Sequence, residues 1–131
     1  MKTFSWSPMR IASLVTALNV LIASGFALAG LVDPKSLLPA GSVPTEASLI
    51  FALYAAARTL PLALITLAAI YRRSATALTV LGLLAGLIQL ADAAIGIFQN
   101  DPAKIFGPLI IAGVQFYALF ILAKSLDQLA I

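Results

Sequence analysis

The stretch ATALTVLGLLAGLIQLADAAIGIFQ, residues 75–99, decides the fold of this chain. It is apolar almost throughout, and its one charged side chain is Asp92. A helix of roughly 20 apolar residues crosses the hydrocarbon core of a bilayer, because each residue adds about 1.5 Å to its length. The segment therefore predicts a transmembrane helix.

Three further apolar blocks lie on either side, at residues 11–31, 47–71 and 105–123, with a proline-containing loop at 32–46. Of the 131 residues, 62% are hydrophobic and 10% are charged, and the mean hydropathy is +1.07. Soluble domains carry about 25% charged residues, and the segments between the blocks are too short to bury a core of their own. We expect an all-α fold, a transmembrane four-helix bundle that forms a single domain over residues 1–131.

Local signals mark the helix ends. Thr45 can cap the second helix, and Glu46 then lies in the first turn, near the positive end of the helix dipole. Asp101 is followed by proline, whose missing N–H costs nothing at the first helical position. In the outer loop, Asp33 and Pro34 predict the start of a short interfacial helix within PKSLLPA.

The basic residues near the helix ends predict the orientation. Those on the side that holds both termini and the second connection are Lys2, Arg10, Arg72, Arg73 and Lys124. The other side has only Lys35 and Lys104. The positive-inside rule therefore places both termini in the cytoplasm. Because the second connection is very short, we also expect the second and third helices to pack as a tight antiparallel hairpin.

The first thirty residues allow another interpretation. A basic start, an apolar run and Ala27-Leu28-Ala29 before Gly30 resemble a secretory signal. The apolar run is longer than the 7–15 residues of a typical signal core, and it contains Asn19. We therefore favour a first transmembrane helix that stays in the protein.

The residue types that are missing exclude several kinds of site. The chain has no Cys and no His, so thiolate catalysis, histidine-ligated haem and cysteine-held metal centres are excluded. The net charge of +3 comes from basic residues scattered at helix ends, which is typical of topology signals rather than of a nucleic-acid surface. We expect no cofactor, no metal and no nucleic acid.

Strongly polar side chains interrupt each apolar block. The candidate ligand-binding residues are Asn19, Tyr54, Arg58, Gln89, Asp92 and Gln115. Helical rise places Arg58 and Asp92 at similar depths, and their side chains tilt toward one another because the second and third helices run in opposite directions. We expect these two charges to pair. One interpretation is a structural ion pair, which persists because breaking it is costly; the other is an intramembrane ligand or proton site.

Small residues follow one face of the third helix. Gly82 and Gly86 form a GxxxG pattern that Gln89, Ala93 and Gly96 extend at helical spacing. Small side chains allow helices to approach closely. We expect this face to be a packing seam inside the bundle rather than a dimer surface.

Several segments together resemble the DoxX-like small bacterial four-helix membrane proteins and related families without an assigned function. They are the proline-containing outer loop, AARTLPLALITLAAIYRR (56–73), LIQLADAAIGIFQND (87–101) and GPLIIAGVQFYAL (107–119). The resemblance implies a multi-pass protein of the bacterial inner membrane. A related sterol-isomerase branch uses clustered acids in a cavity, whereas Asp92 is the one acid within a span here, so we do not expect an enzyme.

Two main functions follow from these observations, ahead of a third, a membrane enzyme that uses Asp92 as a general acid or base. The protein either binds or transports a small amphipathic or anionic ligand at the Arg58 and Asp92 site, or it is an accessory or scaffold subunit in which that pair only fixes the fold. Its expected surroundings are the lipid bilayer and either a second copy or a larger membrane complex. A cavity open to lipid or water beside Arg58 favours the first function. An Arg58 and Asp92 pair sealed by side chains, together with a large apolar patch on one outer face, favours the second.

Overall fold

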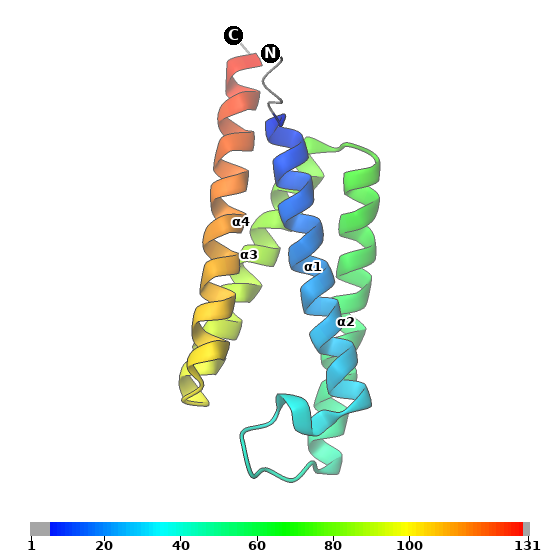
Figure 1. Cartoon of the computed structure of the whole chain (residues 1–131). Coiled ribbons are helices and arrows are strands. Elements are labelled where there is room, and N and C mark those ends of the chain that lie inside the picture. Colours follow the sequence, from blue (N-terminus) through cyan, green and yellow to red (C-terminus); the bar gives the residue numbers. More distant parts are fainter. Residues whose placement is uncertain (1–5, 130–131) are drawn as a thin grey trace.

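The computed structural model describes residues 6–129, which fold into four long α-helices and one short 3₁₀ helix (Figure 1). The elements are α1 (Pro8–Val32), η1 (Pro34–Leu37), α2 (Glu46–Tyr71), α3 (Ala75–Phe98) and α4 (Pro102–Leu129). All four α-helices are long and apolar enough to span a membrane. The predicted transmembrane four-helix bundle is therefore confirmed. Lys2, which entered the charge count, lies outside the described residues.

The helix ends follow the capping chemistry of the sequence. The Thr45 hydroxyl accepts a hydrogen bond from the Ser48 backbone N–H at 3.2 Å, and the Ser48 side chain accepts one from the Thr45 backbone N–H at 2.9 Å. An Asp101 carboxylate oxygen accepts from the backbone N–H of Ala103 at 3.1 Å, directly before α4. Both predicted N-caps are thus confirmed. The predicted loop helix is present as η1, although it ends at Leu37.

Two helices are longer than predicted. α1 begins at Pro8 rather than at residue 11, because Ser7 caps it by accepting a hydrogen bond from the Arg10 backbone N–H. α4 continues to Leu129 rather than ending at 123. The polar tail of α4 contains neither glycine nor proline, so nothing in it stops the helix.

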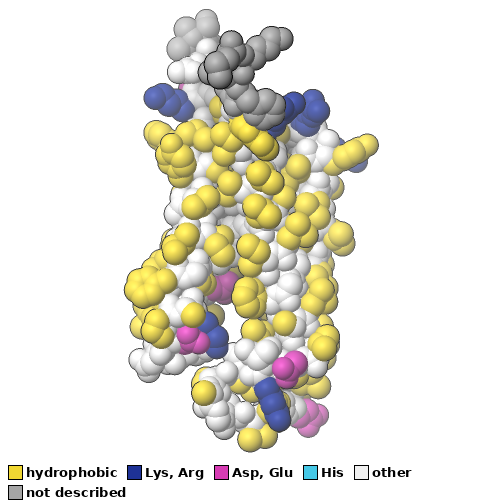
Figure 2. Space-filling view, in the orientation of Figure 1, with side chains coloured by type: hydrophobic (Ala, Val, Ile, Leu, Met, Phe, Trp, Pro, Cys, Tyr) yellow, Lys and Arg dark blue, Asp and Glu magenta, His cyan; other side chains and the backbone are white. Residues whose placement is uncertain are grey.

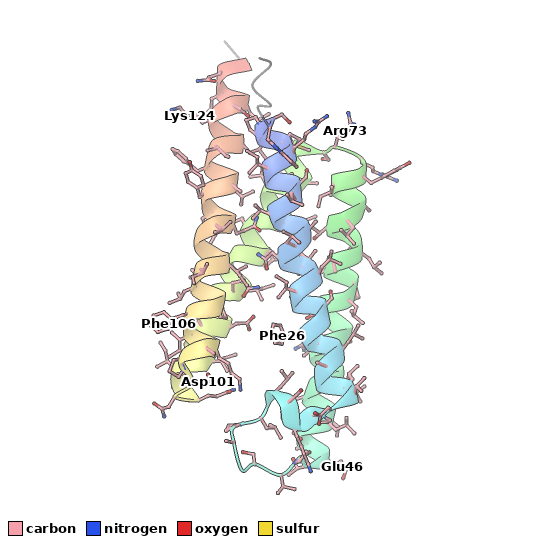
Figure 3. All side chains as sticks on the ribbon, in the orientation of Figure 1. Phe26, Glu46, Arg73, Asp101, Phe106 and Lys124 are labelled. Carbon is pink, nitrogen blue, oxygen red and sulfur yellow. The ribbon has the colours of Figure 1, made fainter. Side chains whose placement is uncertain are left out.

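The chain ends and the connections define two ends of the bundle. Both termini and the α2–α3 turn lie at one end, here called the terminal end (Figure 1). The loop of residues 33–45 and the α3–α4 turn lie at the other, here called the loop end. In Figure 3, Arg73 and Lys124 mark the terminal end, and Glu46 and Asp101 mark the loop end. This arrangement fits four spans, and the cytoplasmic placement of the terminal end stays a prediction.

The helices pack as two pairs, α1 with α2 and α3 with α4, and contact between α2 and α3 is sparse. The predicted tight packing of the second helix against the third is therefore wrong, although their connection is short. The small-residue face of α3 explains the pairing, because it packs on α4. A Cβ at Gly86 would lie 2.5 Å from the Phe116 ring, and one at Gly96 would lie 2.6 Å from the Lys104 carbonyl carbon. The predicted seam inside the bundle is confirmed.

The buried core is narrow and lies mainly toward the terminal end. One cluster joins three helices through Ala12, Leu78 and Leu122. Many large apolar side chains point outward instead, among them Phe51 at 72% and Leu64 at 69% exposed. Figure 2 shows hydrophobic side chains spread over the face in view, with the visible Lys and Arg side chains toward its ends. An apolar flank of this kind is suited to contact with lipid.

Candidate functional site

Four buried polar side chains form a chain of hydrogen bonds in the middle of the bundle. They are Thr16 and Asn19 from α1, Gln89 from α3 and Gln115 from α4. Gln89 Nε2 donates to Asn19 Oδ1 at 2.7 Å, and Asn19 Nδ2 donates to Gln115 Oε1 at 3.1 Å. Gln115 Nε2 donates to Thr16 Oγ1 at 2.8 Å. We call this set the polar network, and it ties three of the four helices together.

Local sequence places these groups. Thr16 and Asn19 are three residues apart, so they share one face of α1. Gly82 of α3 leaves the space in which the network fits. A Cβ at that position would lie 2.8 Å from Gln115 Nε2 and 3.2 Å from Thr16 Oγ1. The glycine that brings α3 close to α4 therefore also allows the amide to reach its partner on α1.

The polar network satisfies itself. Throughout residues 6–129, every buried side-chain nitrogen or oxygen atom has a hydrogen-bond partner. Each member of the network is at most 4% exposed, and amide and hydroxyl groups of this kind do not titrate near neutral pH. The network therefore fixes how the helices meet and offers no acid or base. Of the predicted site residues, it brings Asn19, Gln89 and Gln115 together.

Between the two helix pairs, from the polar network to the loop end, lies a cavity of about 650 Å³. All four α-helices and η1 contribute to its walls, which are mostly apolar. Phe26 projects from α1 into the space between the pairs (Figure 3). Figure 2 shows the molecule hollowed here, with acidic and basic side chains at the margin of the hollow. Phe26 is 61% exposed and Ile95 is 52% exposed, so the cavity is accessible from outside.

The polar groups of the cavity lie at its two ends and on one wall. Asn19 and Gln89 line its inner end, so the polar network forms the floor. Asp92 stands on the wall made by α3, one turn nearer the loop end than Gln89. Lys104 and Asp101 line the mouth. An apolar cavity with a few converging polar groups is the usual form of a small-molecule site.

Lys104 links the two helix pairs at the mouth. Its Nζ donates to the Leu37 carbonyl oxygen of η1 at 3.2 Å and to Gln99 Oε1 at 2.7 Å. It also lies 3.5 Å from Asp101 Oδ2, in an ion pair between partly exposed groups. These partners occupy the one cationic side chain among the residues that line the cavity.

Arg58 and Asp92 do not meet. Within residues 6–129 the ion pair that forms is Lys104 with Asp101, so the expected pair of Arg58 and Asp92 is absent. Arg58 is exposed on α2, and its guanidinium carbon lies 5.7 Å from the centre of the Tyr54 ring. The expectation required α2 and α3 to pack closely, whereas the cavity separates them.

Three of the six candidate residues therefore line the cavity: Asn19, Gln89 and Asp92. Gln115 is completely buried behind them, and neither Tyr54 nor Arg58 is part of the wall. Thr16 was not among the predicted site residues, although its spacing of three residues from Asn19 was an available signal. Lys104 was predicted only as a topology residue, from its place near a helix end. The described part of the chain has no group of three or more His, Cys, Asp or Glu side chains that could hold a metal ion.

Comparison with known protein families, with curated proteins and with solved structures finds no match to this chain. The resemblance to DoxX-like proteins therefore stays a prediction. Function is therefore inferred from the residues of the cavity.

Proposed function

We propose that this integral membrane protein binds a small amphipathic molecule in the cavity between its two helix pairs. The supporting observation is the cavity itself: about 650 Å³, with apolar walls, the Asp92 carboxyl group on one side and a floor of hydrogen-bonded amides. Ligand sites in proteins are commonly clefts of about 300–1,000 Å³ that combine apolar walls with a few placed polar groups. On the DoxX-like resemblance, we place the protein in the inner membrane of a bacterium.

The charges around the cavity favour a ligand that donates hydrogen bonds or carries a positive charge. Asp92 has no ion-pair partner among the described residues, and its oxygens can accept from an amine or a hydroxyl group. Lys104 is already engaged with Leu37, Gln99 and Asp101. Arg58, the residue that would attract an anion, lies outside the wall. A fatty amine or a long-chain alcohol therefore suits the site better than an anionic lipid.

Two glycines of α4 provide a matched test. A Cβ at either Gly107 or Gly113 would meet nothing within 4 Å, but only Gly107 lines the cavity. Gly107→Leu should fill part of the cavity, since its Cβ meets no neighbouring atom, and Gly113→Leu should place the same side chain outside it. Binding of a fluorescent alkylamine, and of a fluorescent alkyl carboxylate of the same length, is measured in detergent micelles. Native mass spectrometry of the gently extracted protein reports any molecule already bound.

The wild type and Gly113→Leu should bind the amine more tightly than the carboxylate, and Gly107→Leu should weaken binding by about tenfold or more, since a filled cavity excludes the alkyl chain. Equal binding by both leucine variants would contradict the cavity proposal. Preference for the carboxylate would contradict the assigned ligand charge. A wild type that carries only bulk lipid and binds neither probe would leave the accessory-subunit function as the better explanation.

A further inference from the structure

Arg58 is a charged residue on the outer surface of the bundle, midway along α2. Phe51 and Ile65, seven residues before and after it on the same face of α2, are also exposed, so the surroundings of the guanidinium are apolar. Arginine in the middle of a spanning helix is costly and in membrane proteins normally faces the protein interior or pairs with another group. The contact that Arg58 makes in the described structure is with the Tyr54 ring, one turn toward the loop end. A ring face attracts the cation but leaves its charge uncompensated.

Asp92 is an equally unusual acid. It lies within α3, away from both helix ends, and its side chain is exposed toward the cavity. The other acidic residues of the described chain, Asp33, Glu46, Asp101 and Asp127, lie at helix ends or in the loop. Neither Asp92 nor Arg58 takes part in an ion pair within residues 6–129. Each copy therefore presents one unpaired cation and one unpaired anion inside the membrane.

Helical rise places the two charges at similar levels along the bundle. Ala55 and Thr59, which flank Arg58 on α2, line the same cavity as Asp92. Arg58 is farther from the loop end of its own helix than Asp92 is from that of α3, and α2 extends beyond α3 at the loop end (Figure 1). The charges nevertheless remain apart within one chain, because they belong to different helix pairs. A two-fold axis along the membrane normal keeps every atom at its depth in the membrane. In a second copy related by this axis, Asp92 therefore lies near the level of Arg58 of the first copy, and Arg58 near the level of Asp92.

We propose that the protein forms a two-fold symmetric dimer in which Arg58 of each copy pairs with Asp92 of the other. A two-fold contact repeats every interaction, so a single arrangement compensates all four charges. The guanidinium is planar and can bind a carboxylate through two parallel hydrogen bonds, and its long side chain allows it to reach across an interface. The partner's Arg58 then completes the wall of the cavity beside Asp92. The partner's Arg58 and a cationic ligand then compete for the same Asp92 carboxylate, so this pairing belongs to the ligand-free protein.

Leucine replacements test the pairing through mixed dimers. In a dimer of Arg58→Leu, Asp92 has no ion-pair partner in either contact. In a dimer of Asp92→Leu, Arg58 has no ion-pair partner in either contact. A mixed dimer of the two variants keeps one complete ion pair and forms one apolar contact. Each variant by itself should therefore dimerise at least about 100-fold more weakly than the wild type. The mixture should recover dimers, and most of them should be mixed.

Energy transfer between labelled copies in phosphatidylcholine vesicles provides the measurement. The chain has no native cysteine, so Gln128→Cys, at the exposed end of α4, gives a single labelling position. Circular dichroism confirms that each variant is folded. Lys124→Leu and Asp127→Leu, which remove exposed charges near the terminal end, serve as matched controls and should dimerise like the wild type.

Three results would overturn the proposal. A wild type that stays monomeric at high protein-to-lipid ratio would show that Arg58 is satisfied by lipid headgroups. Single variants that dimerise as well as the controls would show that the interface lies elsewhere. Folded single variants that lose dimers which mixing does not restore would show that Arg58 and Asp92 act within one chain. Loss of probe binding in Gly107→Leu tests the ligand proposal separately, because Gly107 takes no part in the proposed ion pair.

Discussion

Replacing Gln115 by leucine should destabilise the bundle more than the same replacement at Gln89. Gln115 makes two of the three side-chain hydrogen bonds of the polar network, with Asn19 and with Thr16. Gln89 makes one, with Asn19. Leucine is close to glutamine in volume, so the substitution removes the polar atoms while largely preserving the packing. The difference between the two variants therefore reports hydrogen bonding rather than the loss of core volume.

The network geometry sets the magnitude. Hydrogen bonds between membrane helices contribute about 0.6 kcal/mol on average and up to about 1.7 kcal/mol. Losing one bond should lower the free energy of unfolding by about 0.6–1.7 kcal/mol for Gln89→Leu. Losing two should lower it by about 1–3.5 kcal/mol for Gln115→Leu. The upper half of that range is the more relevant one, because Asn19 Nδ2 is left buried without an acceptor.

Reversible unfolding by dodecyl sulfate in mixed micelles, followed by circular dichroism, measures these differences. Gln128→Leu is the matched control, since Gln128 is exposed near the end of α4, and its effect should stay within about 0.5 kcal/mol. Asn19→Leu, combined with Gln115→Leu, completes a double-mutant cycle. The two changes should be coupled by about 0.5–1.7 kcal/mol, because they share one hydrogen bond.

Two outcomes would refute this reasoning. If Gln115→Leu is no more destabilising than Gln128→Leu, the buried amide contributes nothing that leucine cannot replace. If the losses from Asn19→Leu and Gln115→Leu simply add, the two side chains do not share a bond. Either result would mean that helix packing alone holds α1 against α4 at this level.

Other predictions follow from the helix seam and from the charge distribution. Gly96→Ala should lower stability by about 1–3 kcal/mol, because the new Cβ would meet the Lys104 carbonyl group of the backbone; Gly113→Ala, with nothing within 4 Å, should be neutral or slightly stabilising in the same unfolding assay. A cysteine at Ser42 should react with a membrane-impermeant reagent on intact cells and a cysteine at Ser125 should not, and the reverse labelling would show that the terminal end is external.

The sequence by itself determined that there are four helices, that each is long and apolar enough to span a membrane, and roughly where each begins and ends. Block length and hydrophobicity predict spans because lipid offers the backbone no hydrogen bonds, so each block has to satisfy its own as a helix. The N-caps at Thr45 and Asp101 could also be predicted from the sequence, because capping depends on a few neighbouring residues. The face of α3 that carries Gly82 was predictable for the same reason, because helical periodicity is local.

Only the tertiary structure decided which faces meet. Depth in the membrane follows from counting residues along a helix, so the sequence predicts similar levels for Arg58 and Asp92. Rotation about the helix axis and the choice of packing partner depend on how whole surfaces fit, and the glycine face of α3 fits α4 rather than α2. That choice opens a cavity between the helix pairs. It leaves Arg58 outside and Asp92 inside the cavity, which helical spacing along either segment does not determine.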